Sequence, residues 1–264
     1  MKFKLALAQT KHPVDGDVVA LVERWVSDAR EKGAHMIVFP ESLMSRYEVE
    51  KAQFLAESQP VDGPFSQAMA QIARDKGMWL VYTMNELNPG GLPFNTAVVV
   101  NPQGLQCTAY RKVHLFDSST TRESERMAAG NALCEPVEAP FGLFSVAICY
   151  DLRFPEVARY AALKGTTLMV YPSAWVDGYG KKDQWHALLK ARAIENEMFV
   201  AGVCRCDEGY VGASVVFAPD GSVRAQADGD EALLVCQLDT DDVARMRDAI
   251  PVLDHRRENV YHVK

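Results

Sequence analysis

The chain has 264 residues, of which 48% are hydrophobic and 24% charged, and its formal net charge is −7. These values are typical of a globular protein and exclude disordered and collagen-like chains. The acidic balance also argues against a general binder of nucleic acid or of anionic membranes, so we expect neither partner.

The chain start and the cysteines predict a cytoplasmic protein. No apolar run approaches the roughly 20 residues of a membrane span, and Met1-Lys2-Phe3-Lys4 leads into a strand-like segment without an export signal. Six cysteines in such a chain favour reduced thiols over a disulfide framework. Only Cys204 and Cys206 lie close together, which is a weak zinc signal, so we predict no metal or other cofactor.

The first half of the chain alternates strands and helices. Short apolar runs predict strands over residues 4–10, 36–39 and 79–83, and apolar residues at helical spacing predict helices over 18–33 and 65–76. Turn residues at 102–104 between two strand-like runs predict a hairpin over 96–110.

Parts of the second half resemble the first. Residues 164–172 resemble 32–40, and residues 215–221 resemble 98–104. Two similar halves packed on one core would explain both matches. The alternative is that a helix, a glycine, a strand and a proline in this order are common in α/β proteins. No linker divides the chain, so we predict one domain over 1–264 built from mixed sheets with helices outside. Thr240-Asp241-Asp242 predicts the start of a last helix.

Reactive residues stand where predicted strands end. Glu41 follows the apolar run 37–40, Lys112 follows the hairpin, and Cys149 closes a strand shortly before a helix that begins at Pro155. Since α/β sheets collect their sites at the carboxyl ends of strands, these three side chains are candidates for one site.

Cys149 has a physical reason to be a nucleophile. A thiol at a strand-to-helix turn near a lysine should have a pKa below its reference value of about 8.5. Glu41 would then take the thiol proton, and Lys112 would stabilise an oxyanion. The alternatives are a buried structural cysteine and a papain-like pair with His114 or His186 as the base.

The motifs around these residues resemble those of the nitrilase superfamily, the carbon-nitrogen hydrolases, in the order of that family. They are F-P-E ending at Glu41, Y-R-K-V-H-L-F-D around Lys112, I-C-Y-D-L-R-F-P-E around Cys149, Y-P-S-A-W ending at Trp175, L-L-K-A-R-A-I-E-N ending at Asn196, and P-D-G at Pro219. The resemblance implies an α/β fold, a four-layer α-β-β-α sandwich, that needs no cofactor.

The resemblance also implies an amidase with Glu41, Lys112 and Cys149 as its catalytic triad. Cys149 would attack an amide carbon, Glu41 would pass the thiol proton to departing ammonia, and water would hydrolyse the thioester. Lys112 and the Tyr150 N–H would hold the oxyanion. Glu123 matches a second glutamate of the family that orients the lysine or the substrate.

Within the superfamily the motifs favour an amidase of a carboxylate-bearing substrate. Tyr150-Asp151 after the cysteine resembles amidase branches, whereas true nitrilases usually carry Trp-Glu. The nearest branch is that of deaminated glutathione amidase; ω-amidases acting on α-ketoglutaramate or α-ketosuccinamate come next, and N-carbamoyl hydrolases are a further alternative. Arg153 would bind the carboxylate with its forked guanidinium, or form a structural salt bridge instead. By analogy with the family, Tyr150 and Trp175 are expected to line the substrate pocket.

Two departures bear on the substrate. Gln184-Trp185 stands where these relatives usually carry His-Trp, and residues 42–46 lack the aromatic residue that often follows the glutamate. The family also implies a homodimer or higher homo-oligomer, with helices over 155–164 and 182–196 at the interface. A catalytically weak interaction protein is the alternative outside enzymes, and the intact Glu41, Lys112 and Cys149 argue against it.

Overall fold

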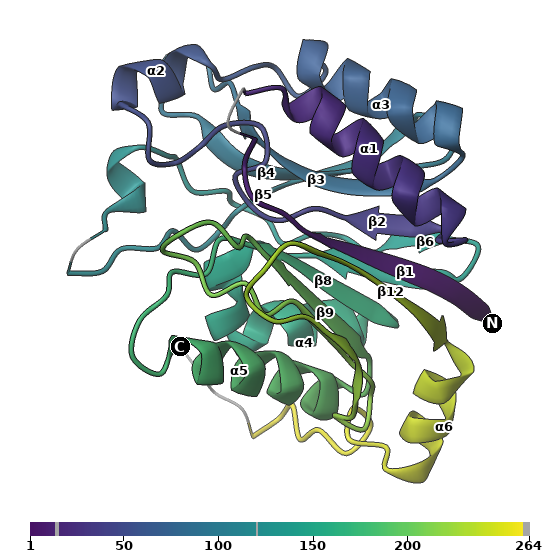
Figure 1. Ribbon diagram of the computed structural model, residues 1–264. Helices are drawn as coiled ribbons and strands as arrows, with labels where there is room; N and C mark the ends of the chain where they lie inside the picture. The colour runs from purple at the N-terminus through teal and green to yellow at the C-terminus, as the bar shows by residue number, and fades with distance from the viewer. Residues whose placement is uncertain (14–15, 120, 261–264) are drawn as a thin grey trace.

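Two β-sheets face each other at the centre of the molecule, and helices cover their outer faces. The computed structural model describes residues 1–13, 16–119 and 121–260. Within these ranges one six-stranded sheet has the order β12-β1-β2-β3-β4-β5 and the other β11-β10-β9-β8-β7-β6. Figure 1 shows α1 and α3 over the first sheet and α4 and α5 over the second. The predicted four-layer α-β-β-α sandwich is confirmed.

The elements have the following bounds. The first sheet consists of β1 (Lys2–Gln9), β2 (Met36–Val38), β3 (Trp79–Glu86), β4 (Phe94–Val100), β5 (Gln106–Arg111) and β12 (Ala232–Asp239). The second consists of β6 (Val137–Ala139), β7 (Gly142–Val146), β8 (Leu168–Ser173), β9 (Phe199–Cys204), β10 (Val215–Phe217) and β11 (Val223–Gln226). The helices are α1 (Val18–Glu31), α2 (Lys51–Ala56), α3 (Pro64–Lys76), α4 (Pro155–Leu163), α5 (Lys181–Asn196) and α6 (Asp241–Ala249), with 3₁₀ turns η1 (Glu123–Glu125) and η2 (Cys149–Arg153). None of the helices so described is long and apolar enough to cross a membrane.

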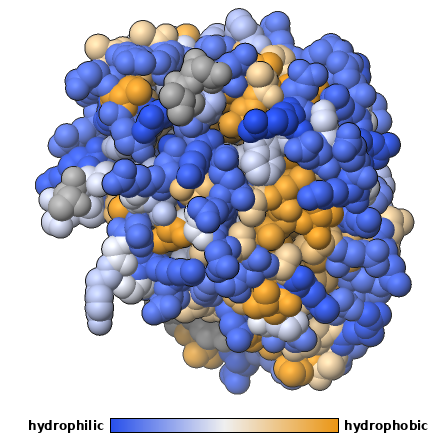
Figure 2. Space-filling model, viewed as in Figure 1, coloured by the Kyte–Doolittle hydropathy of each residue, from blue (hydrophilic) through white to orange (hydrophobic). Residues whose placement is uncertain are grey.

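Alternating side chains let the first sheet be buried on both faces. In β1, Leu5 and Leu7 pack in the core between the sheets, whereas Ala6 and Ala8 pack in the core beneath α1 and α3. Figure 2, which views the sandwich from the side, shows hydrophilic residues over much of the visible face and a group of hydrophobic residues right of its centre. Burying a leucine or valine side chain contributes about 1.5–3 kcal/mol, so the two cores hold the sheets firmly in place.

The two halves of the chain build the same sheet topology. In each sheet three neighbouring parallel strands, β1-β2-β3 and β7-β8-β9, are followed by an antiparallel hairpin, β4-β5 and β10-β11. The similar segments noted in the sequence end in the equivalent strands β2 and β8 and in the two hairpins. The topology therefore agrees with the predicted internal repeat.

The structure corrects three details of the sequence-based prediction. Strand β3 continues to Glu86 rather than ending at Thr83, and α2 has no counterpart among the predicted helices. Thr240 precedes α6 but its side chain does not cap that helix. The reason is a competing charge, because the Met1 ammonium donates to Thr240 Oγ1 and to the carboxylates of Asp239 and Asp241.

Gly202 allows α5 to approach the second sheet closely. A Cβ atom at this position of β9 would lie 2.5 Å from both Leu189 Cδ1 and Trp185 Cζ2, two side chains of α5. That distance is well inside van der Waals contact, so only glycine fits beneath the helix. The start of α5, which borders the site described below, therefore depends on this contact.

We expect Gly202→Ala to lower the free energy of unfolding by about 1–3 kcal/mol, because the added methyl group overpacks the interface between β9 and α5. Urea denaturation monitored by circular dichroism measures the change. Gly229→Ala is the matched control, since a Cβ there meets no atom within 4 Å, and it should stay within about 0.5 kcal/mol of the parent. Equal effects of the two variants would contradict the prediction.

Candidate active site

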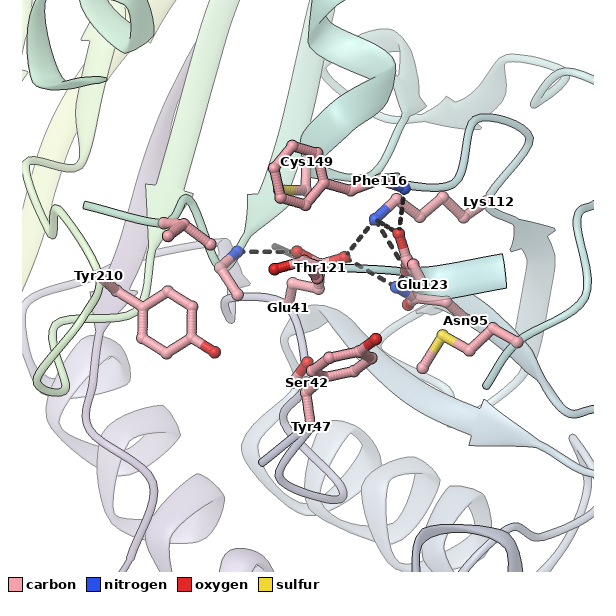
Figure 3. Close-up of a pocket in the computed structure, with 13 residues that line it drawn as sticks. Glu41, Ser42, Tyr47, Asn95, Lys112, Phe116, Thr121, Glu123, Cys149 and Tyr210 are labelled. Atoms are coloured by element: carbon pink, nitrogen blue, oxygen red, sulfur yellow. Dashed lines mark hydrogen bonds and ion pairs between the residues drawn. The ribbon is translucent and has the colours of Figure 1, made fainter. Parts of the chain in front are cut away.

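Three side chains that follow three different strands meet at one edge of the sandwich. Glu41 follows β2, Lys112 follows β5 and Cys149 follows β7. Strand β5 runs in the same direction as β2, because the two pairings between β3 and β5 are both antiparallel. The carboxyl ends of these strands thus bring the three predicted residues together, as Figure 3 shows around one cavity.

The Lys112 ammonium lies at the centre of a buried charge cluster. Its Nζ donates to Glu41 Oε1 at 2.9 Å and to Glu123 Oε2 and Oε1 at 2.8 and 3.0 Å. The side chains of Lys112, Glu41 and Glu123 are only 2%, 5% and 7% exposed, so water screens these attractions weakly. Two carboxylates around one ammonium leave the cluster with an excess negative charge. The position of Glu123 agrees with the predicted role of orienting the lysine.

Further hydrogen bonds hold both carboxylates in place. Asn95 Nδ2 donates to Glu41 Oε1 at 2.7 Å and to Glu123 Oε1 at 3.3 Å. The Ala174 N–H, just after β8, donates to Glu41 Oε2 at 2.8 Å, so Glu41 links the two sheets. The Phe116 N–H donates to Glu123 Oε2 at 2.6 Å. Hydrogen bonds to charged groups are worth about 1.5–3 kcal/mol each, which favours one fixed arrangement.

The cluster keeps Glu41 and Lys112 in their charged forms. Burial alone would raise the pKa of Glu41, but the Lys112 ammonium and the hydrogen bonds from Lys112, Cys149 and Ala174 lower it below its ordinary value. Burial opposes the charge of Lys112, yet Glu123 and Glu41 raise its pKa well above the ordinary value. At neutral pH the site therefore holds an ionised carboxylate beside an ammonium.

The Cys149 thiol contradicts the predicted low pKa. Burial and the Glu41 carboxylate raise its pKa well above the ordinary value, and Lys112 opposes this without reversing it. Sequence reasoning counted the lysine and the helix end but not the loss of water around the thiol. The resting group is thus a thiol hydrogen-bonded to Glu41, which can act as its general base.

The backbone at Cys149 turns sharply out of β7. Its φ angle is 45°, in the left-handed region that costs a non-glycine residue on the order of 1–3 kcal/mol. The turn starts η2 at the cysteine itself and places Tyr150 at its second position. The first N–H groups of a helical turn have no partner within it. The Tyr150 N–H is therefore a candidate donor to an oxyanion formed beside the thiol.

Asp151 ties the Cys149 turn to the Lys112 segment. Its fully buried carboxylate lies within hydrogen-bond distance of four atoms from three residues: Tyr110 Oη at 2.8 Å, Ile148 N at 2.9 Å, His114 N at 3.1 Å and His114 Nδ1 at 2.8 Å. Ile148 directly precedes Cys149, and the other two residues flank Lys112 in sequence. One carboxylate therefore sets the position of the thiol relative to the ammonium.

Cys149 lies between two adjoining cavities of opposite character. The first we call the acidic cavity; it is lined by Glu41, Ser42, Tyr47, Asn95, Lys112, Phe116, Thr121, Glu123, Met127, Cys149, Ala174, Val176 and Tyr210. The second we call the basic cavity; it is lined by Phe116, Cys149, Tyr150, Arg153, Ala174, Trp175, Val176 and Lys181. The net charge changes sign from one side of the thiol to the other.

The three remaining predicted residues meet in the basic cavity. The Arg153 guanidinium stacks 4.7 Å from the ring centre of Trp175 and lies 6.0 Å from that of Tyr150. It donates to Gln184 Oε1 at 2.8 Å, so the residue that departs from the family pattern positions this arginine. The ion pairs found in the described ranges do not include Arg153. The alternative of a structural salt bridge is thus wrong for this part of the chain.

The geometry argues against a papain-like cysteine–histidine pair. His114 lies beside the Asp151 carboxylate and stacks on Phe154, and His186 Nε2 is 3.4 Å from the Ala213 carbonyl. Among the described residues that line the two cavities there is no histidine. Glu41 is the group in position to act as base.

Sequence reasoning missed several residues of the site. Asn95 stands with Thr96 as a polar pair at the start of the otherwise apolar strand β4, and that interruption was a signal that could have found it. Tyr47 lines the acidic cavity with Glu41 and supplies the aromatic group that residues 42–46 lack. Tyr210 lines the same cavity from a loop that no family motif covers.

We expect Asp151→Asn to lower the free energy of unfolding by about 2–4 kcal/mol, because an amide cannot accept all the hydrogen bonds that the buried carboxylate accepts. Activity should fall roughly tenfold or more, since the thiol would shift relative to Lys112. Thermal unfolding and steady-state kinetics measure the two effects. The exposed Asp248→Asn is the control; a variant at Asp151 that behaves like it would refute the assigned role.

Comparisons with known proteins identify the family to which this chain belongs. Residues 4–248 match the family model described as carbon-nitrogen hydrolase. The chain is 33% identical over 274 residues to Omega-amidase NIT2-A of Xenopus laevis, covering 100% of this chain and 98% of that protein. It superposes on Nit3 of Saccharomyces cerevisiae, a member of branch 10 of the nitrilase superfamily, with a TM-score of 0.87, 30% identity and 97% coverage of both chains.

A third relative is an amidase from Nesterenkonia sp. AN1, with a TM-score of 0.80 and 26% identity over 97% of this chain and 94% of that one. Its structure is that of a glutamate-to-glutamine variant in which the acetamide moiety of fluoroacetamide is covalently added at the active-site cysteine. The match of the family model over nearly the whole chain, together with these relatives, confirms the family predicted from the motifs. The chain belongs to the carbon-nitrogen hydrolases of the nitrilase superfamily and is an amidase.

Proposed function

We propose that this amidase hydrolyses short amides whose acyl group carries a carboxylate, through a thioester on Cys149, with α-ketoglutaramate as the first candidate substrate. The observation that carries the proposal is the position of Cys149 between a charged Glu41–Lys112 pair and a cavity lined by Arg153, which has no carboxylate partner among the residues that the structure describes. The similarity to ω-amidases supports the choice of substrate.

The reaction begins with proton transfer from the thiol to Glu41. The Cys149 sulfur then forms a bond to the amide carbon, and the carbonyl oxygen becomes an oxyanion held by the Lys112 ammonium and the Tyr150 N–H. As the carbon–nitrogen bond breaks, Glu41 returns the proton to the leaving nitrogen. Glu41 next takes a proton from water, whose hydroxide attacks the thioester, and the thiol leaves with the proton that Glu41 gives back.

The two cavities give the substrate a direction. Glu41 must reach the leaving nitrogen, and it lines the acidic cavity rather than the basic one. The leaving amine therefore departs on the acidic side, and the acyl group occupies the basic cavity. There the forked guanidinium of Arg153 matches a carboxylate, and the rings of Tyr150 and Trp175 enclose the carbon chain.

The leaving group separates the two nearest candidate activities. α-Ketoglutaramate and deaminated glutathione share the same α-ketoglutaryl acyl group. The first releases ammonia, whereas the second releases the dipeptide cysteinylglycine, so release of ammonia is expected only for the first. Three aromatic side chains, Tyr47, Phe116 and Tyr210, line the acidic cavity where the leaving group would sit. The similarity to ω-amidases supports α-ketoglutaramate over the deaminated glutathione predicted from the motifs.

We also propose that the chain acts as one domain and forms a homodimer through α4 and α5. Leu163 at the end of α4 and Ile194 near the end of α5 are large apolar side chains that are 47% and 43% exposed. Burial of these side chains against a second copy would remove them from water.

We expect Glu41→Gln to lower the pKa of Cys149, because the carboxylate that raises it is removed while Lys112 stays. The alkylation rate with iodoacetamide, measured against pH, should reach its midpoint at lower pH than in the parent, whereas amide hydrolysis should fall by about 10²–10⁴-fold for want of the base. Glu125→Gln changes an exposed neighbouring carboxylate and should leave both unchanged. An unchanged or raised midpoint in Glu41→Gln would contradict this reading of the site.

For the substrate we expect kcat/KM for α-ketoglutaramate to exceed that for deaminated glutathione. The product common to both, α-ketoglutarate, gives the rates, and Cys149→Ala should reduce them by more than about 10³-fold because the nucleophile is lost. A higher kcat/KM for deaminated glutathione would refute the proposal that ammonia is the preferred leaving group. If the protein instead releases carbon dioxide from an N-carbamoyl amino acid and cleaves neither amide, the proposed acyl group of the substrate is refuted.

A further inference from the structure

Lys181 is a second cation at the basic cavity, and no motif or family match singles it out. It is the first residue of α5, and its Nζ lies 5.5 Å from the ring centre of Phe116. Phe116 and Cys149 line the same cavity as Lys181. The ammonium therefore lies on the side of the thiol where the proposed acyl group would be held.

The backbone of Lys181 is fixed against the wall of that cavity. Its carbonyl accepts a hydrogen bond from Trp175 Nε1 at 3.1 Å, and its N–H donates to the Gly178 carbonyl at 3.0 Å. Trp175 is also the ring on which the Arg153 guanidinium stacks. One buried indole therefore contacts both residues, the guanidinium of Arg153 and the backbone of Lys181, and keeps the two residues on the same side of the cavity.

The charge of Lys181 has no carboxylate partner within the ranges that the structure describes, and the same holds for Arg153. The acidic residues nearest in sequence are otherwise placed: Asp177 accepts from the Gly178 N–H, and Asp183 is exposed in the first turn of α5. Two like charges at one half-enclosed cavity repel each other, and an anion between them relieves the repulsion.

We propose that Lys181 is a specificity-determining residue which, together with Arg153, makes the basic cavity select a negatively charged acyl group over a neutral one of the same length. The guanidinium holds the carboxylate oxygens in a defined plane, and the Lys181 ammonium adds a compact charge on a flexible stem. The inference rests on the proposed function for the placement of the acyl group, and it extends it by naming the second charge that recognises the substrate.

The first test measures the cavity directly, without an amide substrate. Iodoacetate and iodoacetamide alkylate the same thiol and differ mainly in charge. The ratio of their rates at Cys149, followed by mass spectrometry of the Cys149 peptide, should fall roughly 3- to 10-fold in Lys181→Gln because an attractive charge is lost. Lys182→Gln is the matched control: it removes the same charge one residue further along α5, from an exposed side chain outside the cavity lining.

The second test uses glutaramate, the monoamide of glutaric acid, and pentanamide, a neutral amide of the same chain length. Lys181→Gln should lower kcat/KM for glutaramate roughly 3- to 10-fold, mainly through KM, and leave pentanamide unchanged. Lys181→Glu should lower the glutaramate value further, since it places a like charge beside the substrate. Thermal unfolding of each variant shows whether it is folded.

The outcomes separate this inference from the proposed function. If Lys181→Gln and Lys182→Gln give the same alkylation ratio and the same preference for glutaramate, the role of Lys181 is refuted while the proposed function stands. If the parent cleaves no carboxylate-bearing amide but the alkylation ratio still falls only in Lys181→Gln, the proposed substrate is refuted and the anion-binding role of Lys181 stands.

Discussion

A buried ammonium held between two carboxylates is the interaction on which the active-site region depends. Removing one partner of such a buried ion pair typically costs about 3–5 kcal/mol, because the remaining charge is left without compensation in a poorly solvated place. Here Asn95 and the N–H groups of Ala174 and Phe116 add hydrogen bonds to the same carboxylates. The protonation states follow from the arrangement: Lys112 keeps its charge, Glu41 stays ionised, and the thiol beside it stays protonated.

In the proposed reaction, the same arrangement would allow a thiol of raised pKa to serve as the nucleophile. The thiol and its base form one hydrogen-bonded pair, so proton transfer does not depend on the thiolate being present beforehand. In the proposed reaction Lys112 would stabilise the negative charge that develops on the substrate oxygen, and the turn at Cys149 makes the Tyr150 N–H a candidate second donor. The hydrogen bonds of Asp151 fix the distance between the Cys149 turn and the Lys112 segment, because its partners lie in both of these parts of the chain.

The opposite charges of the two cavities give the site its polarity. On one side of Cys149 lie the carboxylates of Glu41 and Glu123, and in the proposed reaction Glu41 accepts and returns a proton there; on the other side lie the cations of Arg153 and Lys181, which would favour an anionic acyl group. Trp175, which follows β8 of the second sheet, contacts the Arg153 guanidinium and the Lys181 backbone, whereas Glu41 and Lys112 follow strands of the first sheet. The facing of the two sheets is therefore what joins proton transfer to substrate recognition.

The sequence by itself determined the layered α/β architecture and the residues Glu41, Lys112 and Cys149, because hydrophobic periodicity marks buried strands and reactive residues at their ends stand out against it. It also determined the family, because the motifs around these residues are short stretches of consecutive residues that can be recognised without knowing the fold. Only the tertiary structure decided the direction in which the pKa of Cys149 shifts, the hydrogen bond of Arg153 to Gln184, and the positions of Asn95, Asp151 and Lys181 in the site. Burial and electrostatics depend on which side chains lie close in space, and here those neighbours come from strands and loops far apart in the chain.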